Sequence, residues 1–236
     1  MGEREFRLER LTRREFREAR EVGHFGVAIL ATGSIEQHLE HLAMDQDIAS
    51  STYVAESVAK RLYPNVAVAV PMAVGISEHH MKHPGTLTAK PGSWLAVLFD
   101  AVESLVRVDV KNVLLLNGHG GNVVPVESSM RQWQLFFKNS AAATGGPKVD
   151  LRFHSYWDLV PKEVVQEVLF NEHYPGHAGE FETSIMMKVN PDSVRSDAMG
   201  EQDESGLAES TAEKGRVLID TAIDGVTGVV EEMLAG

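Results

Sequence analysis

The stretch "KNVLLLNG", residues 111–118, is a short and nearly all-apolar segment that ends in a glycine. An apolar run of this length, bounded by a turn residue, is typical of a strand buried on both faces, as in a parallel sheet. The segment before it, "PGSWLAVLFDAVESLVR", has a proline at its start, which favours the first turn of a helix. The two segments together predict a helix followed by a buried strand, the repeating unit of α/β folds.

The same alternation continues in both directions along the chain. Thr12 and Glu15 have the spacing of a capping box, and Gly23 would end the helix that they begin. The remaining predicted elements are a strand at 26–32, a helix at 48–62, a strand at 66–72, a helix at 124–137, a strand at 149–154, helices at 162–169 and 180–187, and a long C-terminal helix from about residue 207. Strands that alternate with helices predict a mostly parallel sheet covered on both faces, in a three-layer α/β/α sandwich.

Length and composition limit the class of protein. The 236 residues, 43% of them hydrophobic, suit one domain over residues 1–236 with a continuous core. The N-terminus "MGEREFRLERLTRREFREAREVG" is charged throughout and the apolar runs are too short to span a bilayer, so we expect a cytoplasmic protein with no membrane partner. The absence of cysteine excludes disulfides, thiolate nucleophiles and zinc fingers. A formal charge of −12 argues against nucleic acid as a partner.

Polar loops follow the predicted strands. They are "TGSIEQHLEHLAMDQD" after the first strand, "GISEHHMKHPGTLT" after the second and "NGHGGN" after the third, and eight of the ten histidines lie in these loops or in "HYPGHAGEFET". Ligands of parallel sheets collect at the carboxyl ends of the strands, where such loops converge. We therefore expect these loops to form one site.

The first and third loops carry side chains that could bind metal. Glu36 and His38 are two residues apart, so in an extended loop both side chains can point toward one ion or two neighbouring ions, and Asp47 could bridge them. The alternative is a helix N-cap for Asp47 and solvated side chains for the other two. Glycines around His119 let the backbone approach a ligand closely. A phosphate-binding turn is the alternative for this segment, but the lysine and spacing of a P-loop are missing.

The segment "HAGEFETS" adds a carboxylate and an imidazole. A glutamate at position 182, next to "IMM", is costly to bury unless a cation or a hydrogen-bond donor compensates it, so Glu182 is a candidate site residue. His177 lies in a loop flanked by glycines, and an imidazole titrates close enough to neutral pH to give a proton to a leaving group; a structural histidine is the alternative. Without a nucleophile motif, hydrolysis would need a metal-activated water. The glycine fingerprint of an NAD enzyme is also missing.

These motifs resemble those of one family. "GSIEQHLEHLAMDQD" resembles the G-S-x-E-Q-H-G-P-H-L-P-x-x-x-D signature of the creatininase (creatinine amidohydrolase) family, and "GISEHHMKHPGTLT" resembles its G-x-S-x-E-H-x-x-F-P-G-T-L-T block. "NGHGGN" and "HAGEFETS" are similar to the third and fourth blocks, and "STAEKG" near Ser210 is similar to a C-terminal A-T-A-E-K-G. The resemblance runs from about Leu11 to Gly215 in the same order.

The resemblance implies a three-layer α/β/α domain, usually assembled as a hexamer, so we expect a homo-oligomer. It also implies a site for one or two divalent ions, which could be zinc, manganese or iron. The implied ligands are Glu36 and His119 for one ion and His38 for the other, with Asp47 as the bridge. Glu182 would bind metal or orient the attacking water, and His177 would transfer protons.

The chain departs from the family pattern at several positions. Leu39-Glu40 replaces the usual Gly-Pro after "EQH", and His83 replaces the phenylalanine before Pro-Gly-Thr. In "SEHH" the glutamate that normally precedes the histidine is displaced, and Gly121 stands where creatininases have a glutamate. The chain reads "HYP" at 173–175, where creatininases carry a tryptophan before "HAG". Creatinine itself is therefore not the expected substrate.

We interpret the sequence as a metal-dependent hydrolase that opens or cleaves an amide or C–N bond in a small, polar, cyclic compound. The family also includes deformylation of an opened purine-like ring and trimming of a cofactor-precursor peptide. Two alternatives remain: hydrolytic ring opening of a carbocyclic keto-inositol, which polar side chains at Glu40, His41 and His83 would suit, and a non-catalytic metal-binding scaffold. The residues expected to contact substrate are His41, Glu40, Ser77, His80, His83, Gly120, Gly121 and Asn122.

Overall fold

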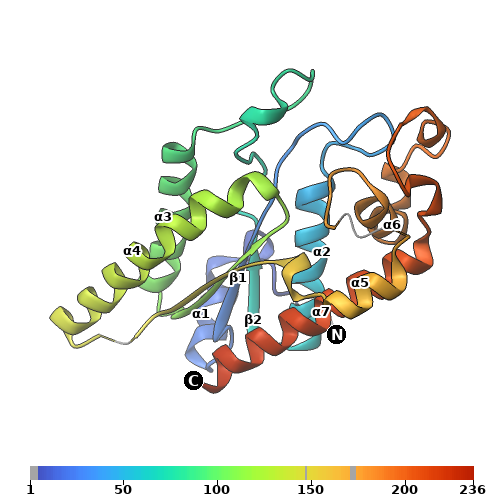
Figure 1. Cartoon of the computed structure of the whole chain (residues 1–236). Coiled ribbons are helices and arrows are strands. Elements are labelled where there is room, and N and C mark those ends of the chain that lie inside the picture. Colours follow the sequence, from blue (N-terminus) through green and yellow to red (C-terminus); the bar gives the residue numbers. More distant parts are fainter. Residues whose placement is uncertain (1–4, 147, 171–173) are drawn as a thin grey trace.

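The chain folds around a four-stranded parallel sheet, as the computed structural model in Figure 1 shows for residues 5–146, 148–170 and 174–236. The strands are β1 (Val27–Thr32), β2 (Val66–Ala69), β3 (Asn112–Asn117) and β4 (Asp150–Ser155), in the spatial order β2-β1-β3-β4. Thr32 of β1 pairs with Asn117 of β3, which pairs with Ser155 of β4. The carboxyl ends of these three strands are therefore level, and the predicted parallel α/β sheet is confirmed.

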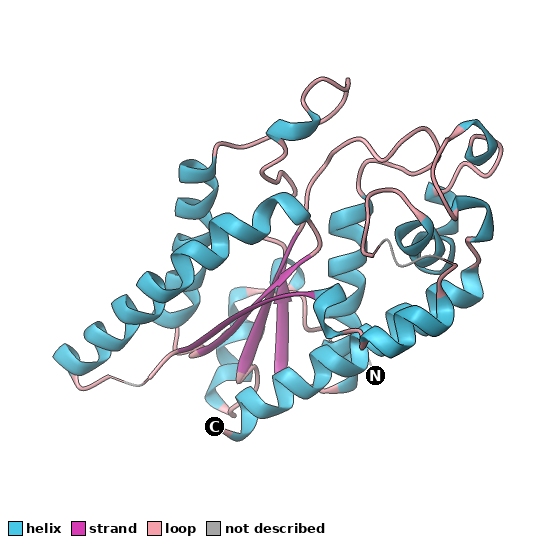
Figure 2. Ribbon diagram, in the orientation of Figure 1, coloured by secondary structure: helices cyan, strands magenta, loops and turns pink. Residues whose placement is uncertain are grey.

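Helices cover both faces of the sheet (Figure 2). They are α1 (Arg13–Glu21), α2 (Gln46–Arg61), α3 (Pro91–Arg107), α4 (Gly120–Thr144), α5 (Lys162–Val168), α6 (Glu180–Val189) and α7 (Ala212–Ala235), with short 3-10 turns between them. Successive strand residues face opposite sides: Ile29 packs in the cluster under α2, α5, α6 and α7, whereas Leu30 packs in the cluster under α3 and α4. This alternation creates two hydrophobic cores, and the sandwich has the three layers that we predicted.

Most predicted elements are present, with shifted ends. The capping box forms, because Thr12 Oγ1 accepts the N–H of Glu15 and the Glu15 carboxylate accepts the N–H of Thr12. Strand β2 ends at Ala69 rather than at residue 72, since Pro71 cannot donate to the ladder. Helix α4 begins at Gly120 and not at residue 124. The earlier start was not predicted because Gly120 and Gly121 have a low helix propensity.

The C-terminal helix differs from expectation in its start. A separate 3-10 turn covers Leu207–Glu209, and α7 begins only at Ala212, where the side chain of Thr211 caps it by accepting the N–H of Lys214. Its apolar stripe, which includes Leu218 and Ile223, packs into the core of the domain. The helix therefore contributes to the core of the domain through this stripe.

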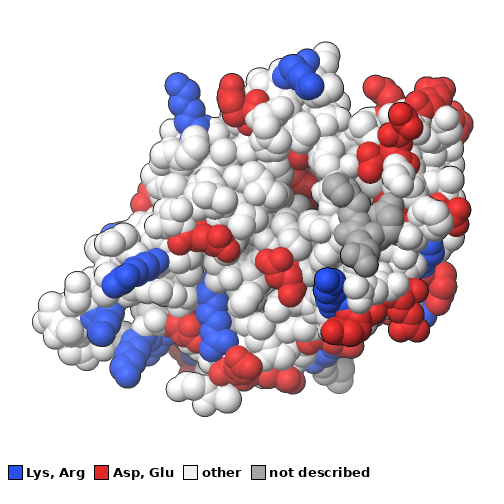
Figure 3. Space-filling view, in the orientation of Figure 1, with Lys and Arg blue, Asp and Glu red and all other residues white. Residues whose placement is uncertain are grey.

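Acidic side chains outnumber basic ones in the sequence, and many of them lie on the surface. Figure 3 shows aspartate and glutamate over much of the right side of this face, whereas lysine and arginine gather mainly toward the lower left. Within the described residues, none of the helices combines the length and the hydrophobicity that crossing a membrane requires.

Candidate metal centre

The loops that follow β1, β2 and β3 meet the start of α6 at a cavity of about 240 Å³. Its lining includes five of the six residues predicted to bind metal or act in catalysis, namely Glu36, Asp47, His119, His177 and Glu182. The first loop is therefore not a solvated surface loop: Glu36 is 2% exposed, His38 is 0% and Asp47 is 2%. Nor does Asp47 serve as the N-cap of α2, because it is the second residue of that helix.

The turn after β3 fixes the position of His119. The Oδ1 of Asn117 accepts the backbone N–H of His119 at 3.1 Å and a side-chain N–H of Asn122 at 3.2 Å, while the amide of Asn117 donates to the carbonyl of His119 at 2.7 Å. A Cβ on Gly118 would lie only 2.1 Å from the carbonyl oxygen of Asp47. Glycine at position 118 thus lets the first turn of α2 pack directly against this turn and brings Asp47 to the site.

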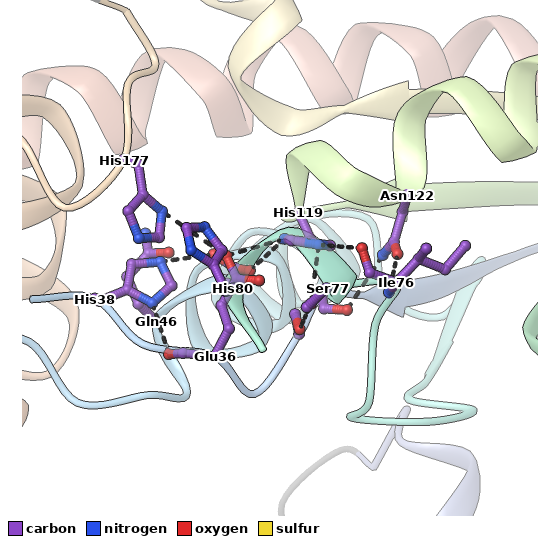
Figure 4. Close-up of polar contacts among 12 residues, drawn as sticks. Glu36, His38, Gln46, Ile76, Ser77, His80, His119, Asn122 and His177 are labelled. Atoms are coloured by element: carbon purple, nitrogen blue, oxygen red, sulfur yellow. Dashed lines mark hydrogen bonds and ion pairs between the residues drawn. The ribbon is translucent and has the colours of Figure 1, made fainter. Parts of the chain in front are cut away.

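A backbone carbonyl sets the orientation of each of the two buried histidines (Figure 4). Nδ1 of His38 lies 3.1 Å from the carbonyl oxygen of Glu36, so Nδ1 donates, and in the neutral ring Nε2 carries the lone pair. That Nε2 faces two carboxylates, with Asp47 Oδ1 at 3.1 Å and Glu182 Oε2 at 3.8 Å.

His119 is oriented in the opposite sense. Its Nε2 lies 3.1 Å from the carbonyl oxygen of Ile76 and 3.2 Å from the hydroxyl of Ser77, so Nε2 donates and Nδ1 keeps the lone pair. Nδ1 then faces Asp47 Oδ2 at 2.9 Å and Glu36 Oε1 at 3.3 Å. A hydrogen bond that directs the other ring nitrogen inward is the usual support of a metal-binding histidine.

Three side-chain atoms that face the interior of this cluster make no hydrogen bond. Glu36 Oε2, His38 Nε2 and Asp47 Oδ2 are buried and have no partner with hydrogen-bond geometry, although oppositely charged groups are close. Burying such groups unpaired is costly. Ligands held 2.0–2.2 Å from one ion in a tetrahedral site lie about 3.3–3.6 Å from each other, so the separations of 2.9, 3.1 and 3.3 Å found here would need to widen by only a few tenths of an ångström around an ion.

Among the residues that the structure describes, three overlapping groups of side chains could each hold an ion: Glu36, His38 and His177; Glu36, His79 and His119; and His38, Asp47 and Glu182. The residues therefore fit a divalent cation. Mixed carboxylate and imidazole ligands suit zinc, manganese and iron alike.

In the metal-free protein, protons occupy the imidazoles of the cluster. Burial disfavours the charged form of His38, but the nearby negative charge of Asp47 outweighs it and raises the pKa of His38 to about 9. Burial also opposes charge on His119, and contacts with Asp47 and Glu36 raise its pKa to about 10. Burial alone would raise the pKa of Asp47, yet the two imidazoles lower it to about 2. A cation would replace these protons.

The pKa values of Glu182 and His177 shift in the opposite directions to those of Asp47 and of the two buried histidines. Burial raises the pKa of Glu182 to about 7, and its Oε2 accepts the N–H of Ala178 at 2.5 Å. Burial, followed by the positive charges of His38 and His80, lowers the pKa of His177 to about 4. The sequence suggested an imidazole that titrates near neutral pH; in the structure His177 is neutral at pH 7 and would begin as a proton acceptor.

The residues expected to contact substrate divide into three groups. His80, Gly120 and Gly121 line the cavity. Ser77 and Asn122 are fully buried behind it: Ser77 bonds His119, and Asn122 Oδ1 accepts the N–H of Ile76 at 3.0 Å. These two residues support the site and do not face the cavity.

The other three expected contacts lie elsewhere. His41 is 0% exposed, its Nε2 lies 2.9 Å from Thr183 Oγ1, and it lines neither this cavity nor the neighbouring one. Glu40 and His83 line a neighbouring cavity of about 450 Å³, together with Gln37 and Arg195. They can meet only a substrate that extends beyond the metal cavity.

Sequence reasoning missed several residues at the site. The amide of Gln37 lies 2.8 Å from His177 Nε2 and 3.0 Å from His80 Nδ1, so it orients both rings; its place inside "EQH" was a signal. His79 lines the cavity and adjoins the predicted His80. Trp157 also lines it, from a 3-10 turn after β4 for which the sequence offered no signal. His173, in the departure at "HYP", lies outside the described residues.

Comparisons with known proteins agree with the geometry. Residues 9–229 match the family described as creatininase, creatinine amidohydrolase. The creatinine amidohydrolase of Pseudomonas putida is 24% identical over 257 residues, covering 94% of this chain and 95% of that protein. The mycofactocin precursor peptide peptidase of Mycobacterium ulcerans is 26% identical, covering 77% of this chain and 65% of that protein. The 3-dehydro-scyllo-inosose hydrolase of Thermotoga maritima is 31% identical, covering 42% of this chain and 32% of that protein.

Solved structures show the same fold. A manganese form of creatininase superposes with a TM-score of 0.82 at 23% identity, covering 97% of this chain and 98% of that chain. A zinc–zinc form of a creatininase mutant superposes with a TM-score of 0.81 at 23% identity, with the same coverage of both chains.

Proposed function

This chain belongs to the creatininase family of metal-dependent hydrolases, and from this premise we propose that it hydrolyses an amide or related C–N bond in a small, polar, cyclic compound other than creatinine. The observation that supports this most directly is the pair of buried imidazoles, His38 and His119, whose lone pairs face buried carboxylates. The cavity of about 240 Å³ suits a small substrate.

In this proposal the metal ligands are Glu36, His38, Asp47, His119 and Glu182. A divalent cation bound there would lower the pKa of a water molecule toward neutrality and polarise a substrate carbonyl. The backbone carbonyls that fix His38 and His119 would keep both rings neutral and oriented once a cation replaces their protons.

Proton transfer would fall to His177. Its ring is neutral at pH 7, and the amide of Gln37 holds it in place at 2.8 Å. His177 would accept a proton from the attacking water and return it to the leaving nitrogen. Glu182, whose pKa of about 7 lies in the working range of a proton carrier, could share this task if it does not bind metal.

Departures from the family pattern support a substrate other than creatinine. Position 121 is a glycine where creatininases have a glutamate, so a carboxylate is missing from the cavity wall. His79 stands where the family block has a glutamate, and together with Gln37 and His80, which match the pattern, it gives the site amide and imidazole groups that suit a polar substrate.

Ring opening of a carbocyclic keto-inositol is the second candidate. The same amide and imidazole groups could bind several hydroxyls of a polyol. The similarity to the inosose hydrolase is confined to 100 aligned residues, so this candidate remains second. A purely structural scaffold is no longer an alternative, because the family is one of hydrolases.

The proposed function is tested by turnover with matched substrates. The protein, stripped of metal and reloaded with zinc or manganese, would be incubated with cyclic amides, formamides, creatinine and keto-inositols. We expect metal-dependent hydrolysis of a C–N bond in a cyclic amide and none of creatinine. Turnover of keto-inositols alone would favour the second candidate, and activity that persists in the metal-free protein would contradict both.

A further inference from the structure

The turn after β3 has no room for a side chain at position 121. A Cβ on Gly121 would lie 2.2 Å from the carbonyl oxygen of Ile76, 2.5 Å from His119 Nε2 and 3.0 Å from His79 Cε1. The first of these atoms belongs to the backbone of the loop after β2 and cannot swing aside as a flexible side chain can. This loop therefore crosses close over Gly121, and it brings the ring of His79 to the space that a side chain at position 121 would enter.

His79 lies among atoms that could bind a cation. One of its ring nitrogens is within 4.8 Å of ligand atoms of both Glu36 and His119. The rings of His79 and His119 are nearly parallel, with 5.7 Å between centroids and an interplanar angle of 11°. His79 is exposed, whereas Glu36 and His119 are buried. Its ring can therefore adjust toward an ion without disturbing the core.

The sequence also indicates that an imidazole at position 79 replaces a carboxylate of the family pattern. Counted onto residues 75–86, the family block G-x-S-x-E-H-x-x-F-P-G-T has its glutamate at the position of His79 and its histidine at His80. Gly121 stands where creatininases have another glutamate. This chain thus has no carboxylate at either of these two positions. It has an additional imidazole at position 79, and the ring of His79 would contact a Cβ added to Gly121.

We propose that His79 is an additional ligand of the ion bound by Glu36 and His119, an inference that rests on the metal site of the proposed function. With Asp47, the ion would then have two imidazole and two carboxylate ligands from the protein. Imidazole suits zinc, whereas manganese prefers oxygen ligands. His79 would therefore favour zinc over manganese at this position, and glutamate in its place would favour manganese.

The test compares three variants, His79→Ala, His79→Glu and, as a control from the same loop, His83→Ala. His83 lines the neighbouring cavity and belongs to none of the three metal-binding groups found among the described residues. Each chelated protein would be titrated calorimetrically with zinc and with manganese. The absorption bands of the cobalt-loaded proteins would report the ligands directly.

For His79→Ala we expect zinc affinity at one position to fall by more than the factor of about 10–100 that follows loss of an outer-shell partner, with altered cobalt bands. His79→Glu should restore binding with a preference shifted toward manganese, and His83→Ala should bind both metals like the wild type. Wild-type affinities and cobalt bands in His79→Ala would overturn the proposal. If the wild-type protein bound no metal at all, the metal site of the proposed function would be refuted. That outcome differs from a wild-type protein that binds metal without using His79. Circular dichroism checks that each variant is folded, and His79→Gln serves as a second variant if alanine is not tolerated.

Discussion

Substitution of Gly118 by alanine should damage the metal site through packing alone. The new Cβ would lie 2.1 Å from the carbonyl oxygen of Asp47, and real Cβ atoms are essentially never closer than 3.0 Å to another atom, so the turn after β3 and the first turn of α2 must separate by about 0.9 Å. Overpacking of this kind typically costs about 1–3 kcal/mol. For a domain of this size each kcal/mol lowers the melting temperature by about 2–4 °C.

The same displacement would move a proposed metal ligand. Asp47 carries the clashing carbonyl, and its two carboxylate oxygens face His38 and His119 at 3.1 and 2.9 Å. A misplacement of about 1 Å can cost about 10²-fold in rate. We therefore expect Gly118→Ala to lose metal affinity as well as stability.

The assay has a matched control in the same turn. A Cβ on Gly120 would meet nothing within 4 Å, so Gly120→Ala should melt at or above the wild-type temperature, since Gly→Ala without strain stabilises by about 0.4–1 kcal/mol. Thermal melting and metal content would be measured for both variants. If Gly118→Ala retained wild-type melting and metal content, the close packing of the turn against α2 would not be what positions Asp47.

Three further predictions concern the site, and one concerns assembly. Asp47→Ala should lose both ions, as measured by elemental analysis; a full metal content would refute the bridging role. His177→Ala should keep its metal but lose roughly 10²–10⁴-fold in turnover, and loss of metal from this variant would instead make His177 a ligand. Because the pKa values of His38 and His119 in the metal-free protein are raised to about 9 and 10, zinc must displace protons, so apparent affinity should rise as the pH increases toward 9; calorimetry that showed no proton release at neutral pH would contradict this. Sedimentation should show a homo-oligomer, hexameric by family resemblance, and a species of only 25.9 kDa would exclude one.

The sequence predicted the framework because local patterns determine it. The apolar residues 113–116 of β3 are buried on both faces, as their composition required, and the strand-loop-helix order brings three polar loops to one edge of the sheet. The ends of β2 and α4 were less predictable. Pro71 limits a strand that its apolar residues would continue, and glycines at the start of α4 conceal a helix that tertiary contacts hold in place.

Side-chain direction within the first loop was beyond sequence reasoning. His38 and His41 lie three residues apart in the same polar loop, and both looked like site residues. The chain turns between them at Leu39, whose φ of +55° lies in the left-handed region, and His41 then packs against Thr183. A backbone angle that a leucine rarely adopts cannot be inferred from composition, so the roles of the two histidines could be separated only in three dimensions.

The two oxygens of Asp47 provide the structural argument for two ions instead of one. Oδ1 faces the lone pair of His38, whereas Oδ2 faces that of His119. The other carboxylates divide between the two sides, since Glu182 approaches His38 and Glu36 approaches His119. One ion would satisfy one side and leave on the other side a buried imidazole and carboxylate that only a proton compensates, which is costly in a dry interior. Two ions that share Asp47 would satisfy both sides, and this arrangement is the one that dinuclear hydrolytic sites use to bind both the nucleophile and the substrate.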